Sequence, residues 1–377
     1  MQDPQDNTTR FFSAAHARRP SFRLALFGVC FAMAVIILGA FTRLVDAGLG
    51  CPDWPGCYGH VLWPTEQNEI AAANQAYPDA PVELDKTWPE MVHRYLATTL
   101  GAIVLVLAAL AVRYRGPGQP LRLPLFLLGF VILQGMFGMW TVTLKLWPQV
   151  VTAHLLGGFT TISLLWLLVL RLNRRHWRVS TADLPRITAL RPLALAALLV
   201  VIGQIALGGW TTSNYAAVAC PDLPTCQGRW LPSADFAAGF DVLQQVGPNY
   251  LGGTMTNEAR VAIHLSHRLG ALVTLLVAGL LALRLLRDPH AEVRRLGVVV
   301  GTVLTLQFLL GLSNILFQFP VLVATAHNAV GALLLLSMVT VNFYLATVNQ
   351  PLPALADDPA PGQGHDALLG RATLGSS

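Results

Sequence analysis

The stretch Glu90-Met-Val-His93-Arg94 marks the point where a polar, acidic segment gives way to a long apolar run, residues 95–112. A run of that length and composition predicts a helix that crosses a membrane, so His93 is expected just inside the bilayer. An ionisable side chain at that depth is costly to bury and is a functional candidate by default. The stretch therefore predicts a membrane protein with a functional histidine near one surface.

Composition supports this interpretation along the whole chain. Of its 377 residues, 54% are hydrophobic and only 12% are charged. The apolar residues fall in runs near the length that spans a bilayer, which predicts an all-α polytopic membrane protein with eight transmembrane helices. The expected spans are 22–45, 90–113, 122–145, 149–172, 190–212, 259–284, 294–317 and 321–346.

Arginines are unevenly distributed between these spans. They gather in the segments after the second, fourth and sixth spans, which predicts that these segments and both termini face the cytoplasm. The arginines are Arg113, Arg115, Arg122, Arg171, Arg174, Arg175, Arg178, Arg186, Arg191, Arg284, Arg287, Arg294 and Arg295. They account for the net charge of +5 as orientation signals, so a lipid bilayer is the expected partner and nucleic acid is not. The predicted location is a bacterial inner membrane that the chain crosses several times.

The segments outside the spans differ in character. The segments 46–89 and 213–258 are long and hold mostly acidic charge, so they are expected on the outer side. Residues 1–21 form a cytoplasmic tail before a retained first helix, because no small-residue cleavage site follows the first apolar run. Residues 173–189 form a cytoplasmic linker, and the tail 347–377, rich in Pro, Gly and Asp, is predicted to be disordered.

The chain contains an internal repeat. The loop Cys51-Pro-Asp-Trp-Pro-Gly-Cys57 reappears as Cys220-Pro-Asp-Leu-Pro-Thr-Cys226, at the same distance from Thr42 as from Thr211. Each repeat holds four spans, an even number, so both halves have the same orientation. We expect two four-helix bundles, 22–172 and 190–346, related by a pseudo-two-fold axis along the membrane normal.

Three further histidines occupy places like that of His93. His154, His267 and His327 each stand near the start of an apolar helix that begins on the outer side. The second and fourth helices of each half thus supply one histidine apiece, and helix bundles build cofactor sites from facing helices. We therefore pair His93 with His154, and His267 with His327.

The surroundings of these pairs favour one kind of ligand. A zinc or copper site usually recruits further Cys, His or carboxylate ligands, whereas these pairs stand among small and apolar residues that leave room for a flat ring. Haem, with the histidines as iron ligands, fits better than a bare metal ion. Arg94 and Arg268, beside the ligands, are candidate partners for haem propionates. The alternative is that the small residues serve helix packing and the arginines reach lipid headgroups.

The combined pattern resembles the haem A synthase family, the bacterial CtaA and mitochondrial Cox15 proteins, from about residue 22 to residue 344. The motifs that carry the resemblance are Cys51-Pro-Asp-Trp-Pro-Gly-Cys57, Glu90-x-x-His93-Arg94, Thr152-Ala-His154, His267-Arg268 and Thr325-Ala-His327. The resemblance implies an enzyme that oxidises the C8 methyl group of haem O to a formyl group, giving haem A for terminal oxidases. It also implies a bound haem b cofactor, with substrate in one half and cofactor in the other.

One difference between the repeats suggests which half does what. Glu90 stands three residues before His93, whereas His264 holds the matching place before His267. Positions three apart share a helix face, so we assign the half with Glu90 to haem O, with Glu90 as an acid/base or cation-stabilising group. The other half would hold haem b. A structural role for Glu90, as a first-turn acid after Pro89, is the alternative. His264 is either a spare ligand or a hydrogen-bonding core residue, and the core residue is the favoured interpretation.

The cysteines of the outer segments complete the candidate site. Cys51 with Cys57, and Cys220 with Cys226, are expected to form disulfides in an oxidising compartment. They would either clip the outer loops over the haems or, as thought for the first pair in the family, take part in redox exchange. Short helices over 66–76 and 234–246 are expected to cap the bundles.

A non-enzymatic alternative also fits the four histidines. A di-haem b-type cytochrome would relay electrons without modifying either haem. The resemblance instead implies that the haem O synthase, a protohaem farnesyltransferase, supplies the substrate. Small-residue patches facing lipid would also allow a homo-oligomer.

Overall fold

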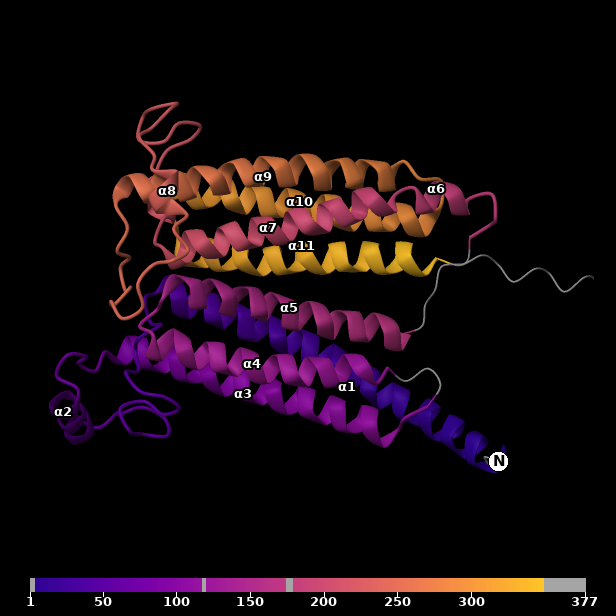
Figure 1. The fold of residues 1–377 in the computed structure, drawn as a ribbon, viewed down its shortest axis with the longest axis horizontal. Coiled ribbons are helices and arrows are strands. Elements are labelled where there is room, and N and C mark those ends of the chain that lie inside the picture. The colour runs from indigo at the N-terminus through magenta and orange to yellow at the C-terminus, as the bar shows by residue number, and fades with distance from the viewer. Residues whose placement is uncertain (1–3, 117–119, 174–178, 349–377) are drawn as a thin grey trace, which may run out of the picture.

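The computed structural model describes residues 4–116, 120–173 and 179–348, and its architecture is helical (Figure 1). Within that part of the chain, eight helices are long and apolar enough to cross a membrane, as the sequence predicts. They are α1 (Pro4–Leu44), α3 (Leu84–Arg113), α4 (Arg122–Thr143), α5 (Pro148–Asn173), α7 (Arg191–Ser213), α9 (Asn257–Leu286), α10 (Ala291–Leu316) and α11 (Val321–Thr347). The shorter elements are α2 (Gln67–Ala76), α6 (Leu184–Thr188), the 3-10 turn η1 (Ala217–Ala219) and α8 (Phe236–Gly239).

The spanning helices form two groups. Helices α1, α3, α4 and α5 pack around one another, and α7, α9, α10 and α11 form the second group beside them (Figure 1). The groups meet where α1 packs on α11 and where α5 packs on α7 and α11. The contact of α1 with α11 corresponds to the contact of α7 with α5, as a two-fold relation between the halves requires. The axis itself stays a prediction.

Side chains link the two groups at several depths. The Trp166 indole N–H of α5 donates to the Thr340 hydroxyl of α11 at 2.7 Å. At the end that carries the cysteine loops, the Arg43 guanidinium lies 4.0 Å from the centre of the Tyr215 ring and donates to the Thr212 carbonyl at 2.8 Å. These polar contacts add to apolar packing between α1, α5 and α11. The two halves therefore hold a defined relation to each other.

The internal repeat extends to the backbone. Non-glycine residues rarely adopt a positive φ, and here they do so at corresponding places, for example at Asp46 and Tyr215. The turn before α5 and the turn before α11 match in the same way, with Leu146 at φ 61° and Phe319 at φ 60°. The loops that close the helices were therefore duplicated together with the helices.

The predicted span boundaries agree with the structure within a few residues, except at the starts of α1 and α3, and one short helix differs from its prediction. Helix α3 begins at Leu84, six residues before the expected start, and Pro89 lies inside it. The predicted short helix over 234–246 is wrong beyond its first turn: α8 ends at Gly239, whose carbonyl accepts a hydrogen bond from the Trp210 indole at 2.8 Å. Because the Gly239 carbonyl bonds to the Trp210 side chain of α7, it does not accept a further hydrogen bond that would continue α8.

Two of the sequence-based predictions, the linker 173–189 and the C-terminal tail, fall partly outside the described residues. Arg174, Arg175 and Arg178 of the linker 173–189 lie there, as does the predicted tail after residue 348. The N-terminal segment differs from a simple tail, because the backbone is helical from Pro4 and runs without interruption into the first span.

Candidate functional site

The four histidines lie near the N-terminal ends of α3, α5, α9 and α11, at the end of the molecule that carries the cysteine loops (Figure 1). His93 and His154 face each other, with ring centres 6.5 Å apart and ring planes at 89°. Metal–imidazole bonds of about 2 Å on each side would hold the ring centres roughly 6 Å apart. His267 and His327 are also near enough to interact electrostatically. The structure thus brings together both pairs that the sequence predicts.

A glycine of the preceding helix supports each imidazole. A Cβ added at Gly39 of α1 would stand 2.7 Å from the Cε1 atom of His93. The same test gives 3.2 Å at the other three sites, where Gly138 meets His154, Gly208 meets His267 and Gly311 meets His327. Each ring therefore lies against bare helix backbone, and a larger residue at any of these positions would push it aside.

A glutamine one turn before the glycine contacts three of the four imidazoles. The Nε2 atom of Gln134 lies 3.0 Å from Nδ1 of His154 and donates to the His154 carbonyl at 2.5 Å. Gln204 repeats this arrangement at His267, with distances of 3.1 and 3.0 Å. The Nε2 atom of Gln307 lies 3.3 Å from Nε2 of His327. These amides limit how far the three rings can turn.

The donor groups in this region fit haem better than a bare cation. Among the residues that the structure describes, no group of three or more His, Cys, Asp or Glu side chains is placed to hold a metal ion. Haem needs only axial ligands from the protein, because the porphyrin fills the other iron positions. The Nδ1 atoms of His93 and His327 are buried and lack a hydrogen-bond partner within the described residues. The donor set, two imidazoles without further ligands, therefore fits a haem and does not fit a bare cation.

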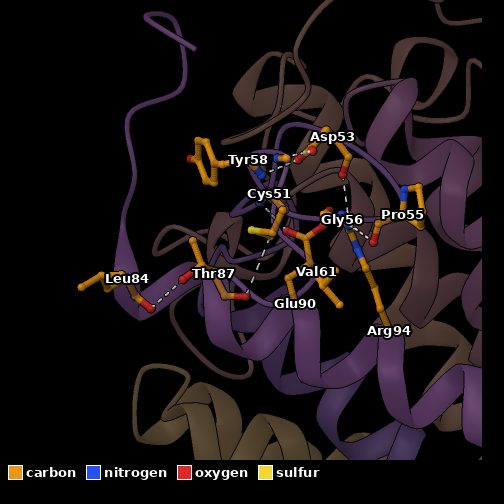
Figure 2. Close-up of a disulfide and its surroundings, with 12 residues drawn as sticks. Cys51, Asp53, Pro55, Gly56, Tyr58, Val61, Leu84, Thr87, Glu90 and Arg94 are labelled. Atoms are coloured by element: carbon orange, nitrogen blue, oxygen red, sulfur yellow. Dashed lines mark hydrogen bonds and ion pairs between the residues drawn. A yellow bond between two sulfur atoms is a disulfide. The ribbon is translucent and has the colours of Figure 1, made fainter. Parts of the chain in front are cut away.

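Glu90 lies in the second turn of α3, because the helix starts at Leu84. The alternative that Glu90 serves as a first-turn acid is therefore wrong. Its carboxylate is buried, at 5% exposure. One oxygen accepts the backbone N–H of Cys51 at 2.9 Å, and the other accepts from Arg94 at 2.5 Å (Figure 2). Glu90 thus connects α3 to the disulfide loop.

Arg94 and Arg268 hold the cysteine loops onto their helices. Arg94 donates to the carbonyls of Asp53 and Gly56 at 3.0 and 2.6 Å (Figure 2). Arg268 donates to the carbonyls of Thr225, Cys220 and Asp222 at 2.9, 2.7 and 2.9 Å. The Nε atom of Arg268 is buried without a partner within the described residues, so this guanidinium keeps a free donor. Pairing with haem propionates stays a prediction for both.

Both predicted disulfides are present, Cys51–Cys57 and Cys220–Cys226. An aspartate closes each loop from within: Asp53 accepts the backbone N–H groups of Tyr58 and Gly59 at 2.6 and 2.8 Å. Asp222 accepts those of residues 227 and 228 at 2.6 and 3.0 Å in the second loop. Each loop is thus cross-linked, closed by a carboxylate and fastened by an arginine.

Electrostatics differ between the two loops. Burial raises the pKa of the Tyr58 phenol to about 12, and the charges of Glu83, Glu90 and Asp53 add to the rise. The phenol therefore stays neutral at physiological pH. In the second loop, a hydrogen bond from Thr225, followed by the backbone bonds at residues 227 and 228, lowers the pKa of Asp222. The lowered pKa of Asp222 therefore stabilises the second loop near neutral pH, whereas the Tyr58 shift matters only at alkaline pH.

His264 occupies the place that Glu90 holds in the first half, but it makes different contacts. It is buried, at 4% exposure, and its ring meets that of Phe319 edge-on, with centres 6.4 Å apart. Its Nδ1 atom has no hydrogen-bond partner within the described residues. The ring also hydrogen-bonds to the backbone of Ala216, so the prediction of a hydrogen-bonding core residue agrees with the structure.

The sequence analysis missed the roles of the glutamines and of the glycines under the rings. The available signal was the spacing Gln-x-x-x-Gly, which occurs at Gln134, Gln204 and Gln307, each followed four residues later by the glycine that supports a histidine. Nothing in the sequence alone showed that these glutamines face imidazoles. The spacing reveals these contacts only when the structure places the helix with the glutamine and glycine beside the helix with the histidine.

Comparison with known proteins agrees with this geometry. The model of the COX15-CtaA family, described as cytochrome oxidase assembly proteins, matches residues 22–339. The chain belongs to the COX15-CtaA family. Within it, the haem A synthase of Shewanella oneidensis is 47% identical over 315 residues, 84% of this chain and 93% of that relative. The haem A synthase of Caulobacter vibrioides is 28% identical over 326 residues, 81% of this chain and 90% of the relative. Haem A synthase COX15 of Saccharomyces cerevisiae is 27% identical over 344 residues, 80% and 70% of the two chains.

Proposed function

We propose that this membrane protein is a haem A synthase, an enzyme that oxidises the C8 methyl group of haem O to a formyl group. The product, haem A, would serve terminal oxidases. Membership of the COX15-CtaA family and 47% identity to a haem A synthase support the activity. The observation that carries the proposal is the facing pair His93 and His154, which has the separation that two axial ligands need.

The two halves hold different haems in this proposal. His93 and His154 bind haem O, and His267 and His327 bind haem b as the resident cofactor. Bound haem supplies redox-active iron, and axial histidines and their hydrogen bonds tune it. Support for the assignment comes from the buried carboxylate of Glu90, which lies one turn before His93 and has no counterpart in the second half.

Glu90 acts near the substrate as an acid/base or cation-stabilising group. Its position is fixed by Cys51 and Arg94, so its charge is held close to the helix turn that bears His93. Arg94 and Arg268 stand one residue after a histidine in each half, where they can reach the propionates. For Arg268 the unpartnered Nε supports that role.

The membrane setting follows from the distribution of charge. Arg113, Arg115 and the arginines of 284–295 lie at the end of the helices opposite the cysteine loops. By the positive-inside rule that end faces the cytoplasm, together with both termini, and the disulfides face the oxidising side of a bacterial inner membrane. The haem O synthase is the expected source of substrate, and a homo-oligomer is compatible with the exposed small-residue faces.

Pigment analysis tests the activity. The chain is expressed with a haem O source in a host that lacks its own haem A, and the extracted haems are separated by chromatography. We expect haem A from the wild type and none from a His93→Ala/His154→Ala variant. A membrane-inserted wild type that carries haem b and leaves all haem O unchanged would overturn the proposal and favour a di-haem cytochrome.

Single-half variants test the assignment of the haems. A His267→Ala/His327→Ala variant should lose the haem b that co-purifies with the protein and keep the ability to bind haem O. The His93→Ala/His154→Ala variant should keep haem b. The reverse pattern of loss would exchange the roles of the two halves.

A further inference from the structure

Each cysteine loop continues into two large apolar residues that pack against nothing. We call these pairs the first tip, Val61 and Leu62, and the second tip, Trp230 and Leu231. The four residues are 79%, 58%, 77% and 92% exposed, in that order. Exposed apolar groups of this kind mark contact with another molecule or with a membrane. The tips occupy equivalent places in the internal repeat, so both halves present the same kind of surface.

The turns that present the tips are fixed by backbone hydrogen bonds. Cys57 and His60 bond to each other in both directions at 3.0 Å, and Cys226 and Arg229 do so at 3.0 and 3.1 Å. Both cysteines are also held in disulfides. Each tip begins directly after such a pair, so the folded loop itself directs these apolar side chains outward.

Both loops lie beside the spanning helices. Arg94 fastens the first loop to α3 ten residues after the helix begins at Leu84, about 15 Å along its axis. Arg268 fastens the second loop to α9 eleven residues after Asn257, about 16 Å along the axis. The loops project sideways from the outer ends of the helices, past α3 on one side of the molecule and past α9 on the opposite side (Figure 1). They therefore extend over the lipid that surrounds the bundles.

The first tip is attached to the exposed face of a span. The Tyr95 hydroxyl donates to the Val61 carbonyl, and Tyr95 is an exposed residue of α3. In the second half the corresponding residue of α9 is Leu269, which is also exposed, and the aromatic ring is on the tip itself as Trp230. Tyrosine and tryptophan are enriched where a membrane meets water. Each half thus places one such ring where its tip meets the surface of a span.

Charge around the tips also fits a membrane surface. The stretch 54–65 contains no Asp, Glu, Lys or Arg, although the outer segment as a whole is acidic. The stretch 223–234 contains one charged residue, Arg229, directly before Trp230. An arginine beside a tryptophan suits the headgroup layer, because the guanidinium can bond to lipid phosphate while the indole lies against the acyl chains.

We propose that both tips insert into the outer leaflet and anchor the cysteine loops in the interfacial layer of the bilayer. A bilayer surrounds the molecule and meets both sides alike. A partner protein would need two sites on opposite sides of the molecule, and an isologous dimer contact would cover one tip and leave the other exposed. Anchored tips keep the first loop, whose Cys51 N–H bonds to Glu90, at the level of the lipid.

Site-directed spin labelling of the full chain in liposomes tests the proposal. Leu62→Cys or Leu231→Cys is made in a Cys30→Ala background and labelled with a nitroxide without reductant, so that the disulfides stay closed. Oxygen concentrates in lipid and a nickel chelate stays in water. Both labels should collide several-fold more often with oxygen than with the chelate, as a label on exposed Leu272 of α9 should. A label on exposed Asn68 of α2 should show the opposite preference.

Quenching of tryptophan fluorescence by brominated lipids measures the second tip without an added cysteine. Trp230→Phe should lower the quenched fraction, whereas Trp210→Phe, which removes a buried indole, should leave it unchanged. Equal quenching in Trp230→Phe and wild type would overturn the proposal.

The labels separate lipid from the other possible surroundings of the tips. A preference for the nickel chelate would place the tips in water, and protection from both reagents would mean that a second copy of the chain covers them. Either result, or insertion of one tip alone, would overturn the paired anchor. The measurement needs no bound haem, so its failure would leave the proposed haem A synthase activity standing.

Discussion

The two halves of the molecule agree in how they support imidazoles and differ in what surrounds one of them. Glycines under the rings, disulfide loops, loop-closing aspartates and loop-fastening arginines occur in both. The differences gather at His93: Glu90 replaces the histidine of the second half, and Val35 replaces the glutamine. The repeated scaffold is thus the same in both halves, and the surroundings of His93 differ from those of the other three histidines. Under the proposed function, this local difference separates the half that binds haem O from the half that binds haem b.

Glu90 should show the largest contrast between the halves. Glu90→Ala is expected to lower haem O conversion by about a hundredfold or more, as loss of an acid/base group does, while the co-purifying haem b remains. His264→Ala, its counterpart, should leave conversion within a few-fold of wild type. Conversion is measured as haem A formed per protein in membranes.

Glu90→Gln distinguishes charge from attachment. The amide oxygen can still accept the N–H of Cys51, but the negative charge beside Arg94 is lost. Conversion that recovers with Gln would assign Glu90 to holding the loop, and turnover in Glu90→Ala equal to wild type would remove it from the mechanism altogether.

The glycines under the rings should show the next largest effect. Gly39→Ala places a Cβ 2.7 Å from His93, whereas Gly208→Ala places one 3.2 Å from His267. Overpacking of this kind costs about 1–3 kcal/mol, so the first variant should lose haem O affinity by roughly tenfold to a hundredfold, and the second should lose less haem b. Haem content by spectrum measures both.

Gly135→Ala is the matched control for these variants. Gly135 lies one residue after Gln134, and nothing lies within 4 Å of the Cβ that would be added. It should therefore keep full haem content. A loss in Gly135→Ala comparable to that in Gly39→Ala would mean that α-helical glycines matter here for a reason other than the imidazoles.

Much of this fold was predictable because a bilayer imposes simple length and polarity rules. The eight spans, the histidine pairing and both disulfides follow from apolar runs and a repeat with fixed spacing. The start of α3 was not predictable in this way. A proline normally marks a helix start, but Pro89 lies inside α3, which begins at Leu84. The partners of Glu90 were also hidden, since Cys51 reaches it through a loop whose path depends on Arg94.

The disulfides test whether the halves differ in stability as well as in chemistry. Each closes a short loop of sequence separation 6, so loss of either should cost about 2 kcal/mol by chain entropy. Cys51→Ala/Cys57→Ala should cost more than Cys220→Ala/Cys226→Ala, because it also loosens the N–H that Glu90 binds. Thermal release of haem, followed by absorbance, reports the order. Equal shifts would mean that Glu90 holds its place without the loop.

The smallest expected effect concerns the loop carboxylates and pH. The pKa of Asp222 is lowered by hydrogen bonds from Thr225 and from the amides of residues 227 and 228. The ionised form therefore stabilises the loop above the ordinary aspartate pKa of about 4, and this stabilisation is lost as pH falls through the lower folded value. Hydrogen exchange at residues 227 and 228 should accelerate in Asp222→Ala at neutral pH. Asp53→Ala should accelerate exchange in its own loop less, because Glu90 also holds that loop through the backbone N–H of Cys51. Equal acceleration in the two loops would show that the hydrogen bond from Cys51 to Glu90 does not stabilise the first loop.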